Sequence, residues 1–338
     1  MIMINLDEIK NIDSSNIHKI YDAWPDIARD AYNQNYDEIK FKNIDHIVFA
    51  GMGGSGAIGD VFAAILSKMN IHVTVVKGYN LPKTVDSKTL VIITSVSGNT
   101  DETLTILKST MNLTCKTISF SSGGKIEDYC KKNKLEFRKI SFLHSPRASF
   151  ISFLFSMLKI LKKITQIKNQ DIIECIKCLK NTNEKISTKN LVKNNPALKL
   201  AEWLTECPVI YYPHGLESSA VRFKNSLQEN TKMHVITENV VEACHNGIVA
   251  WEKKSKLKPI LIRGKKDYVK TIERWEILKE YFKSESIDYY EIITKGNNII
   301  TKIVYLIYFL DYVSIYKAIL SEIDPSPVKS IDYIKSKL

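Results

Sequence analysis

Two loops that combine glycine with hydroxyl residues carry the clearest chemical signal in the sequence. Residues 51–56 read GMGGSG and residues 95–100 read SVSGNT, and each loop follows an apolar run. Backbone N–H groups at the start of a helix bind anions, and Ser and Thr hydroxyls donate hydrogen bonds to phosphate oxygens. We therefore predict that the two loops form one cradle for a phosphate monoester. Its predicted members are Gly53, Gly54, Ser55, Ser95, Ser97 and Thr100.

The first loop also fits the dinucleotide pattern G-x-G-x-x-G. A dinucleotide site needs an acidic residue about 20 residues further on, at the end of the second strand, to bind a ribose. That strand ends in TVVKGYN, with Lys77 in place of an acid, and the next acid after Asp60 is Asp86. NAD is therefore disfavoured, and NADP has only weak support through Lys77. The plainest alternative is that the hydroxyl residues cap helices, but two such loops after neighbouring strands favour phosphate.

Apolar segments alternate with helical segments along the chain, which is typical of parallel sheets covered by helices on both faces. The first half has predicted strands at 46–50, 72–79, 89–94 and 116–122 and predicted helices at 59–69 and 101–109. The pattern then restarts, with a predicted strand that runs into a loop over 208–215. Further strands are predicted at 232–239 and 258–264, and helices at 216–230, 268–282 and 298–320. These elements predict two doubly wound, parallel-sheet α/β domains.

Changes in composition suggest where the domains begin and end. We expect a helical segment over residues 1–40, a first domain over 41–165, a polar helical connector over 166–196, and a second domain with C-terminal helices over 197–338.

Composition narrows the range of partners. The net charge of +11 favours anionic ligands, but basic and aromatic residues do not interleave as in a nucleic-acid platform, so no nucleic acid is expected.

The apolar runs 149–160 and 303–310 are shorter than the roughly 20 residues of a membrane span, so both are expected in the core. No metal-ligand cluster is evident. The six cysteines lack a disulfide framework and the chain starts without a signal peptide, so we expect a cytoplasmic protein.

Longer motifs add a resemblance to a known family. GMGGSG followed by SVSGNTDETL resembles the SIS (sugar isomerase) domain. SPRASF, NSLQENTK, CHNGIVAWE and DPSPV follow in that order and resemble the bifunctional phosphoglucose/phosphomannose isomerase family, from about residue 45 to the C-terminus. The resemblance implies two SIS domains, flavodoxin-like sandwiches packed together. It also implies reversible isomerisation of glucose 6-phosphate and mannose 6-phosphate with fructose 6-phosphate, a reaction of glycolysis and gluconeogenesis.

The resemblance also implies a mechanism and an assembly. The proton moves between two sugar carbons through a cis-enediol, without cofactor or metal, in a homodimer with active sites at its interface. Glu229 in LQENTK matches the base, His245 in CHN matches the residue that opens the sugar ring from across the interface, and Arg147 in SPRASF matches the group that stabilises the enediolate. From the residues alone, an exposed helix-end glutamate is the more common interpretation of Glu229, and His245 and Arg147 fit a hydrogen-bonded loop histidine and an ion-paired arginine.

Four further positions, within or after the matched motifs, extend the predicted site. Ser326 falls where the family carries a small hydroxyl residue, and Lys335 is the first choice for a C-terminal lysine near the substrate, with Lys337 second. Arg222 matches a family position near the site without an assigned role.

A non-catalytic regulator that binds a sugar phosphate through SIS domains is the alternative function. Such regulators usually carry a separate DNA-binding helix-turn-helix, and the first 40 residues are too short and too acidic for one.

Overall fold

The computed structural model describes residues 4–37, 39 and 41–337, and these form two compact α/β units. One unit comprises the described residues up to Asp22 together with those from Lys177 on, and the other runs from Ala23 to Ile176. The predicted segments 1–40 and 197–338 include residues 1–3, 38, 40 and 338, which lie outside the described residues. The predicted domain boundaries stay a prediction.

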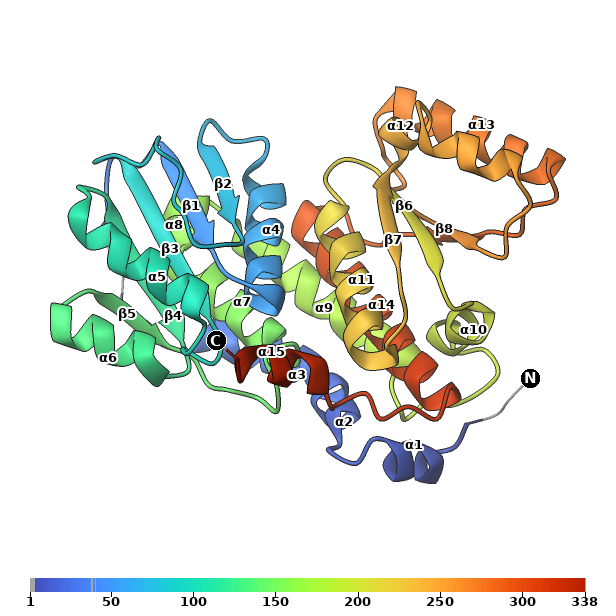
Figure 1. Ribbon diagram of the computed structural model, residues 1–338, viewed down its shortest axis with the longest axis horizontal. Coiled ribbons are helices and arrows are strands. Elements are labelled where there is room, and N and C mark those ends of the chain that lie inside the picture. The colour runs from blue at the N-terminus through green and yellow to red at the C-terminus, as the bar shows by residue number, and fades with distance from the viewer. Residues whose placement is uncertain (1–3, 38, 40, 338) are drawn as a thin grey trace. The chain divides into compact units, whose positions relative to one another are not determined.

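The unit from Ala23 to Ile176 is built on a five-stranded parallel sheet with the order β2-β1-β3-β4-β5 (Figure 1). Its strands are β1 (His46–Ala50), β2 (His72–Val76), β3 (Thr89–Ser95), β4 (Lys116–Ser121) and β5 (Glu136–Lys139). Every residue of β1 and β3 is buried, because helices cover both faces of these central strands. The order reverses between β1 and β3, and the loops after these strands meet there.

Helices cover the two faces of this sheet in separate groups. One group packs α4 against α7 and α7 against α3, while α5 and α6 pack on the opposite face around Val48, Ala50, Val91 and Ile93. The helices and turns of the unit are α3 (Trp24–Asn33), α4 (Gly53–Leu66), α5 (Asp101–Ser109), η1 (Thr110–Asn112), α6 (Gly124–Asn133), α7 (Phe150–Ile160) and α8 (Lys162–Thr165).

The other unit repeats this architecture on a four-stranded parallel sheet with the order β7-β6-β8-β9. Its strands are β6 (Pro208–Tyr212), β7 (Ile236–Asn239), β8 (Lys258–Arg263) and β9 (Tyr290–Ile293). Helix α14 packs against α10 and α11 on one face, and α12 packs against α13 on the other. The helices and turns are α1 (Leu6–Ile12), α2 (Ile17–Asp22), α10 (Pro196–Trp203), α11 (Glu217–Thr231), α12 (Val240–Ala243), η2 (Gly247–Glu252), α13 (Val269–Ser284), α14 (Ile299–Leu320) and α15 (Lys329–Lys335). Helix α9 (Asn169–Ile186) contributes residues to both units.

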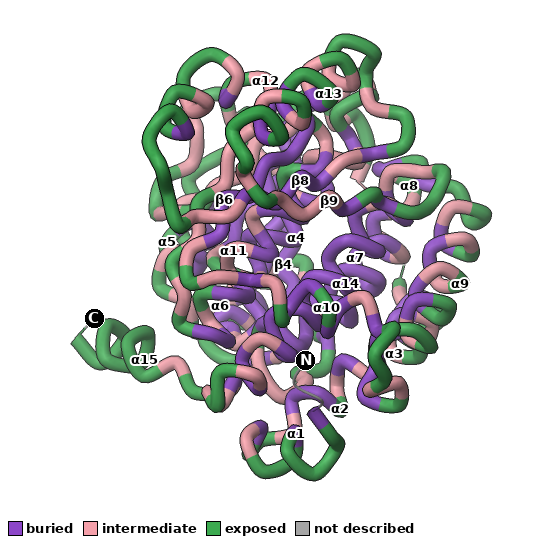
Figure 2. The backbone as a smooth tube through the Cα atoms, turned by 90° about the vertical axis from the view of Figure 1, so that its right-hand side faces the viewer, coloured by how far each residue is buried: buried purple, intermediate pink, exposed green. Residues whose placement is uncertain are grey.

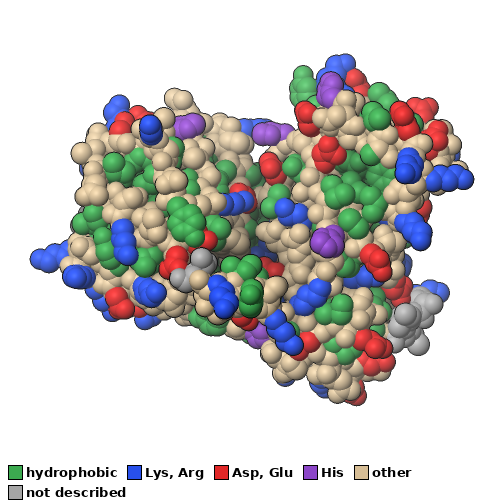
Figure 3. Space-filling view, in the orientation of Figure 1, with side chains coloured by type: hydrophobic (Ala, Val, Ile, Leu, Met, Phe, Trp, Pro, Cys, Tyr) green, Lys and Arg blue, Asp and Glu red, His purple; other side chains and the backbone are tan. Residues whose placement is uncertain are grey.

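Helix α14 is the central helix of its unit. With 22 residues, this helix is long and apolar enough to cross a membrane, whereas the predicted apolar run 303–310 was too short. However, 89% of its most apolar window is buried inside the structure. Figure 2 shows this burial along α14, in contrast to the exposed helix α15. Such burial is the property of a core helix. On the face in Figure 3, Lys and Arg side chains are scattered among Asp and Glu side chains.

The sequence predicts the central elements well and misses two of the four edge strands. The strand at 46–50 is confirmed, and the two predicted parallel-sheet α/β units are present. The predicted helix 59–69 is wrong at its start, because the glycine loop itself forms the first turn of α4. The predicted strand 232–239 is too long, because Lys232 is the left-handed C-cap of α11. Strands β5 and β9, at the sheet edges, were not predicted, because their sequences EFRK and YEII include charged residues and form no continuous apolar run.

Candidate active site

The hydroxyl residues of the two predicted loops come together at the carboxyl ends of β1 and β3. Ser55 Oγ, from the first turn of α4, accepts a hydrogen bond from the Val96 N–H at 3.2 Å. Ser95 Oγ accepts one from the Gly98 N–H at 3.1 Å and lies 3.0 Å from Thr100 Oγ1. The bond from Val96 therefore links the first turn of α4 to the loop after β3, which carries the paired hydroxyls of Ser95 and Thr100.

These hydrogen bonds also decide what the hydroxyls can offer to a ligand. Ser55, Ser95 and Ser97 each use an oxygen lone pair to accept a backbone N–H bond. A hydroxyl carries one proton to donate and two lone pairs, so accepting such a bond leaves the protons of Ser55 and Ser97 available. Between Ser95 and Thr100, one hydroxyl donates to the other, and one proton of the pair is left. The loops therefore present hydroxyl donors without a formal charge. A phosphate monoester, which has three acceptor oxygens, suits such a set of donors.

Backbone geometry explains why glycine recurs in these loops. A Cβ on Gly56 would lie 2.7 Å from the Gly51 carbonyl oxygen, so the two backbone segments touch. Gly98 has a φ of +71°, and a Cβ there would lie 1.7 Å from the Gly123 carbonyl oxygen. In the dinucleotide pattern the glycines thus reflect close backbone packing at Gly56 and a left-handed backbone at Gly53, whose φ is +50°.

The start of α4 adds backbone donors beside these hydroxyls. Met52 is the N-cap, and its side chain makes no capping hydrogen bond. The N–H groups of Gly53 and Gly54 have no hydrogen-bond partner among the residues that the structure describes. Two donors at the positive end of a helix of 14 residues are suited to an anion.

Lys77, the basis of the weak NADP alternative, is already engaged. Its Nζ forms an ion pair with Asp60 Oδ2 of α4 at 2.6 Å. Strand β2 ends at Val76 without an acidic residue at its carboxyl end. The geometry therefore offers no ribose-binding carboxylate at the place where a dinucleotide site has one.

Arg147 lies in the folded loop that leads into α7 and is only 5% exposed. Ser149 Oγ accepts a hydrogen bond from the Leu143 N–H at 2.9 Å, which closes this loop on itself. Trp24 Nε1 donates to the Ala148 carbonyl oxygen at 3.1 Å. These contacts fix the backbone on the C-terminal side of Arg147 and hold a guanidinium inside the unit, where charged groups are rare.

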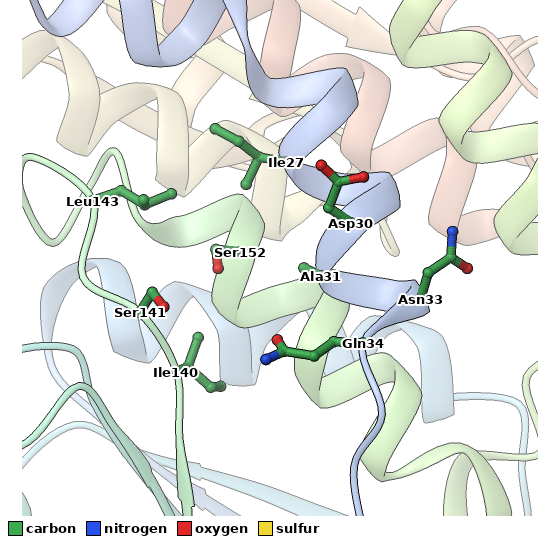
Figure 4. Close-up of a pocket in the computed structure, with 9 residues that line it drawn as sticks. All are labelled: Ile27, Asp30, Ala31, Asn33, Gln34, Ile140, Ser141, Leu143 and Ser152. Carbon is green, nitrogen blue, oxygen red and sulfur yellow. The ribbon is translucent and has the colours of Figure 1, made fainter.

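A pocket of about 470 Å³ lies beside the same loop but contains none of the predicted site residues (Figure 4). It is lined by Ile27, Asp30, Ala31, Asn33, Gln34, Ile140, Ser141, Leu143 and Ser152. Its walls come from α3, α7 and the segment that precedes Arg147. The pocket and the hydroxyl cradle are therefore different features of this unit.

In the other unit, the structure brings Glu229 close to the turn that contains Ser326. Glu229 is half-buried near the C-terminal end of α11. Lys232 Nζ donates hydrogen bonds to the Glu229 carbonyl oxygen and, at 2.8 Å, to the Pro327 carbonyl oxygen. The Ser326 N–H donates to Asp324 Oδ1 at 2.9 Å, which folds the turn. Sequence reasoning missed Lys232, whose role depends on a contact with a distant turn.

His245 lies in an exposed turn after α12. Its N–H donates to the Glu242 carbonyl oxygen at 2.8 Å, and Asn246 Nδ2 donates to Glu242 Oε1 at 3.1 Å. Nearby, burial and then the charge of Glu242 raise the pKa of Glu238. A Cβ on Gly247 would lie 2.4 Å from Glu238 Oε2, so this carboxylate fills the space beside the turn. Glu242 thus holds the turn that presents the histidine.

Lys335 has the least structural support among the predicted site residues. It lies at the end of α15, which has no buried residue, and its side chain forms no hydrogen bond or ion pair among the described residues. Lys337 lies over the ring of Tyr333, 5.9 Å from its centroid. Within residues 4–37, 39 and 41–337, no group of three or more His, Cys, Asp or Glu side chains could hold a metal ion.

The fold and the cradle together define the class of the protein. Two units with parallel sheets, one of which presents hydroxyl loops where the strand order reverses, are the arrangement of SIS-domain proteins. Residues 40–145 match the model of the SIS domain, and residues 193–338 match that of the bacterial phospho-glucose isomerase C-terminal SIS domain.

Individual relatives identify the family within that class. A bifunctional phosphoglucose/phosphomannose isomerase from Caldicellulosiruptor bescii is 33% identical over 89% of this chain and 91% of its own length. Another from Aquifex aeolicus is 29% identical over 93% and 94%. The solved tagatose-6-phosphate ketose/aldose isomerase from Escherichia coli shares the fold, with a TM-score of 0.63 at 13% identity, over 95% of this chain and 96% of that chain. The chain belongs to the bifunctional phosphoglucose/phosphomannose isomerase family, which confirms the predicted resemblance and fold class.

Proposed function

We propose that the protein catalyses the reversible isomerisation of glucose 6-phosphate and mannose 6-phosphate with fructose 6-phosphate. The observation that carries this proposal is the set of loop hydroxyls that accept backbone N–H bonds. The protons of Ser55 and Ser97, and one proton of the Ser95–Thr100 pair, are left to bind a phosphate. Family membership supports the same substrate class. In this proposal Gly53, Gly54, Ser55, Ser95, Ser97 and Thr100 bind the 6-phosphate.

Aldose–ketose isomerisation moves a proton between C1 and C2 while the carbonyl moves in the opposite direction. We assign Glu229 as the base that removes the proton from one carbon and returns it to the other, through a cis-enediol intermediate. His245 protonates the ring oxygen as the sugar ring opens, and its exposed imidazole is accessible for this step. The buried guanidinium of Arg147 stabilises the negative charge that develops on the enediolate oxygen.

The remaining assignments follow from the family. Ser326 contacts the sugar, since Lys232 ties its turn to the end of α11 near Glu229. Lys335 reaches the substrate from α15. The active unit is a homodimer with active sites at its interface, and the protein acts in glycolysis or gluconeogenesis in the cytoplasm. A sugar-phosphate-binding regulator is not favoured, because the relatives that cover most of this chain are isomerases.

Turnover of fructose 6-phosphate tests the proposal. The purified protein is incubated with fructose 6-phosphate in the presence of EDTA, and glucose 6-phosphate and mannose 6-phosphate are resolved as products. We expect both products from the wild type and a loss of about 100-fold or more in the Glu229→Gln variant. Glu280→Gln, at an exposed glutamate of α13 in the same unit, is the matched control and should keep full activity. Tight binding of the sugar phosphate without turnover would support the regulator instead.

A further inference from the structure

A buried ion pair joins α11, the helix that carries Glu229, to the central helix α14. Arg222 Nη2 donates to Asp311 Oδ2 at 2.7 Å, and Arg222 Nε lies 3.2 Å from Asp311 Oδ1. The side chains are 2% and 0% exposed. Ser226 Oγ donates to Asp311 Oδ1 at 2.6 Å. We refer to Arg222, Ser226 and Asp311 as the α11–α14 ion-pair cluster. Helices α11 and α14 lie side by side in Figure 1.

A buried ion pair contributes little net stability to a contact between helices. Removing two charges from water costs free energy that their attraction only partly recovers, and apolar residues of similar volume often pack as well or better. What such a pair does supply is geometry: a guanidinium and a carboxylate that meet through two N–H groups allow a single relative position. Most residues of helix α14 are buried and apolar, and Asp311 is its only acidic residue, so a carboxylate is unusual there.

The cluster lies on the face of α11 that carries Glu229. Arg222, Ser226 and Glu229 are spaced by four and three residues, which places them on one side of the helix within two turns. Asn230, next to Glu229, continues the contact by donating to Ser314 Oγ of α14 at 2.8 Å.

Electrostatics link the same residues. Burial alone would lower the pKa of Arg222, but the charge of Asp311, then Tyr21 and the charge of Glu229 raise it. Arg222 therefore interacts with both the anchoring carboxylate on α14 and the proposed base on its own helix.

We infer that the α11–α14 ion-pair cluster is a positioning device for Glu229: it fixes the rotation and axial position of α11 on α14 and so sets where the carboxylate stands against the substrate carbons. Arg222 and Asp311 are positioning residues and do not touch the substrate. This inference rests on the proposed role of Glu229. Since misplacement of a reacting group by about 1 Å costs on the order of 100-fold in rate, a small shift of α11 has a large kinetic effect.

Variants that alter reach without removing charge test the inference. Arg222→Lys keeps the positive charge but loses the two-pronged contact, and it should lower kcat by about 10- to 100-fold with KM for fructose 6-phosphate within about twofold. Adding Asp311→Glu lengthens the opposite side chain by one methylene. The double variant should regain at least part of the lost kcat. A cluster that only stabilises the fold would change the unfolding midpoint and leave kcat of the folded protein unchanged.

Control variants distinguish a failed positioning role from a failure to fold and from a failure of the proposed function. Arg263 of β8 forms an ion pair with Glu291 at 2.8 Å in the same unit, and Arg263→Lys should leave kcat unaltered. If Arg222→Lys does not fold, Ser226→Ala removes only the hydroxyl donor and should still lower kcat by roughly 3- to 10-fold at unchanged KM. A wild-type protein without isomerase activity overturns the proposed function. Normal kcat in these cluster variants, beside an inactive Glu229→Gln, overturns only the positioning role.

Discussion

Replacement of Ser55 by alanine separates the two tasks that one hydroxyl performs in the cradle. Ser55 is 7% exposed, and its Oγ accepts the Val96 N–H bond at 3.2 Å. The substitution leaves this N–H buried and without its acceptor. An unsatisfied buried donor costs about 1–3 kcal/mol, so the free energy of unfolding should fall by that amount. The loop after β3 should also lose its link to α4.

The same substitution removes a proposed donor to the substrate phosphate. A hydrogen bond to a charged group contributes about 1.5–3 kcal/mol. At about 1.4 kcal/mol for each factor of ten, kcat/KM for fructose 6-phosphate should fall by roughly 10- to 150-fold. Most of the loss should be seen in KM, because the phosphate does not react and is bound equally in ground and transition states.

The assay combines urea unfolding with steady-state kinetics, and Ser67→Ala is its control. Ser67 is the C-cap residue of the same helix, and its exposed hydroxyl donates to the Ala64 carbonyl oxygen. This control should leave KM unchanged. If Ser55→Ala loses the expected stability but keeps the wild-type KM, Ser55 is a structural residue that joins the loops, and the reasoning about its spare proton is wrong.

Two further predictions concern stability. Burial alone would raise the pKa of Asp13, but hydrogen bonds from His18 lower it. A carboxyl with a lowered pKa stabilises the fold at pH values above its unfolded pKa of about 3.9. That stabilisation is lost as the pH falls through the pKa of the folded protein. Asp13→Asn should therefore lower stability at neutral pH and flatten its dependence on pH below about 4, and parallel acid-unfolding curves would contradict this. Gly98→Ala should lower the free energy of unfolding by at least about 1–2 kcal/mol, because alanine is strained in a left-handed backbone and its Cβ would displace Gly123. The variant should also have a higher KM. Gly78→Ala, where a Cβ meets nothing within 4 Å, is the control in urea unfolding, and equal losses in both variants would refute the steric argument.

The sequence predicts the central strands because parallel strands are buried on both faces and read as continuous apolar runs. Strand β1 was predicted to the residue for this reason. Strand β5 reads EFRK and is polar because it lies at the sheet edge. It therefore contains no apolar run from which a strand could be predicted. The start of α4 was missed because glycines normally oppose helix formation. Here they form its first turn, where the backbone packs tightly and donors are needed.

The site is predictable where function depends on local sequence and not where it depends on distant contacts. Ser55 and Ser95 stand out because small hydroxyl residues follow apolar strands. Nothing in the sequence indicates that Arg222 meets Asp311, which lies 89 residues further on. Lys232 reads as a surface lysine at a helix end, and its hydrogen bond to Pro327 becomes evident only in the folded unit. Such residues shape a site through the tertiary structure.

The central claim, that Glu229 moves a proton between C1 and C2, is tested most directly by hydrogen exchange with solvent. The protein is incubated with fructose 6-phosphate in D2O, and deuterium at C2 of the aldose products is measured by NMR. We expect deuterium at C2 in the products of the wild type, because a carboxylate base exchanges its proton with water during turnover. We also expect Glu229→Gln to bind the sugar phosphate but to lose both exchange and isomerisation by about 100-fold or more. Isomerisation without any deuterium incorporation, or a Glu229→Gln variant with wild-type exchange, would contradict the proposed role of Glu229.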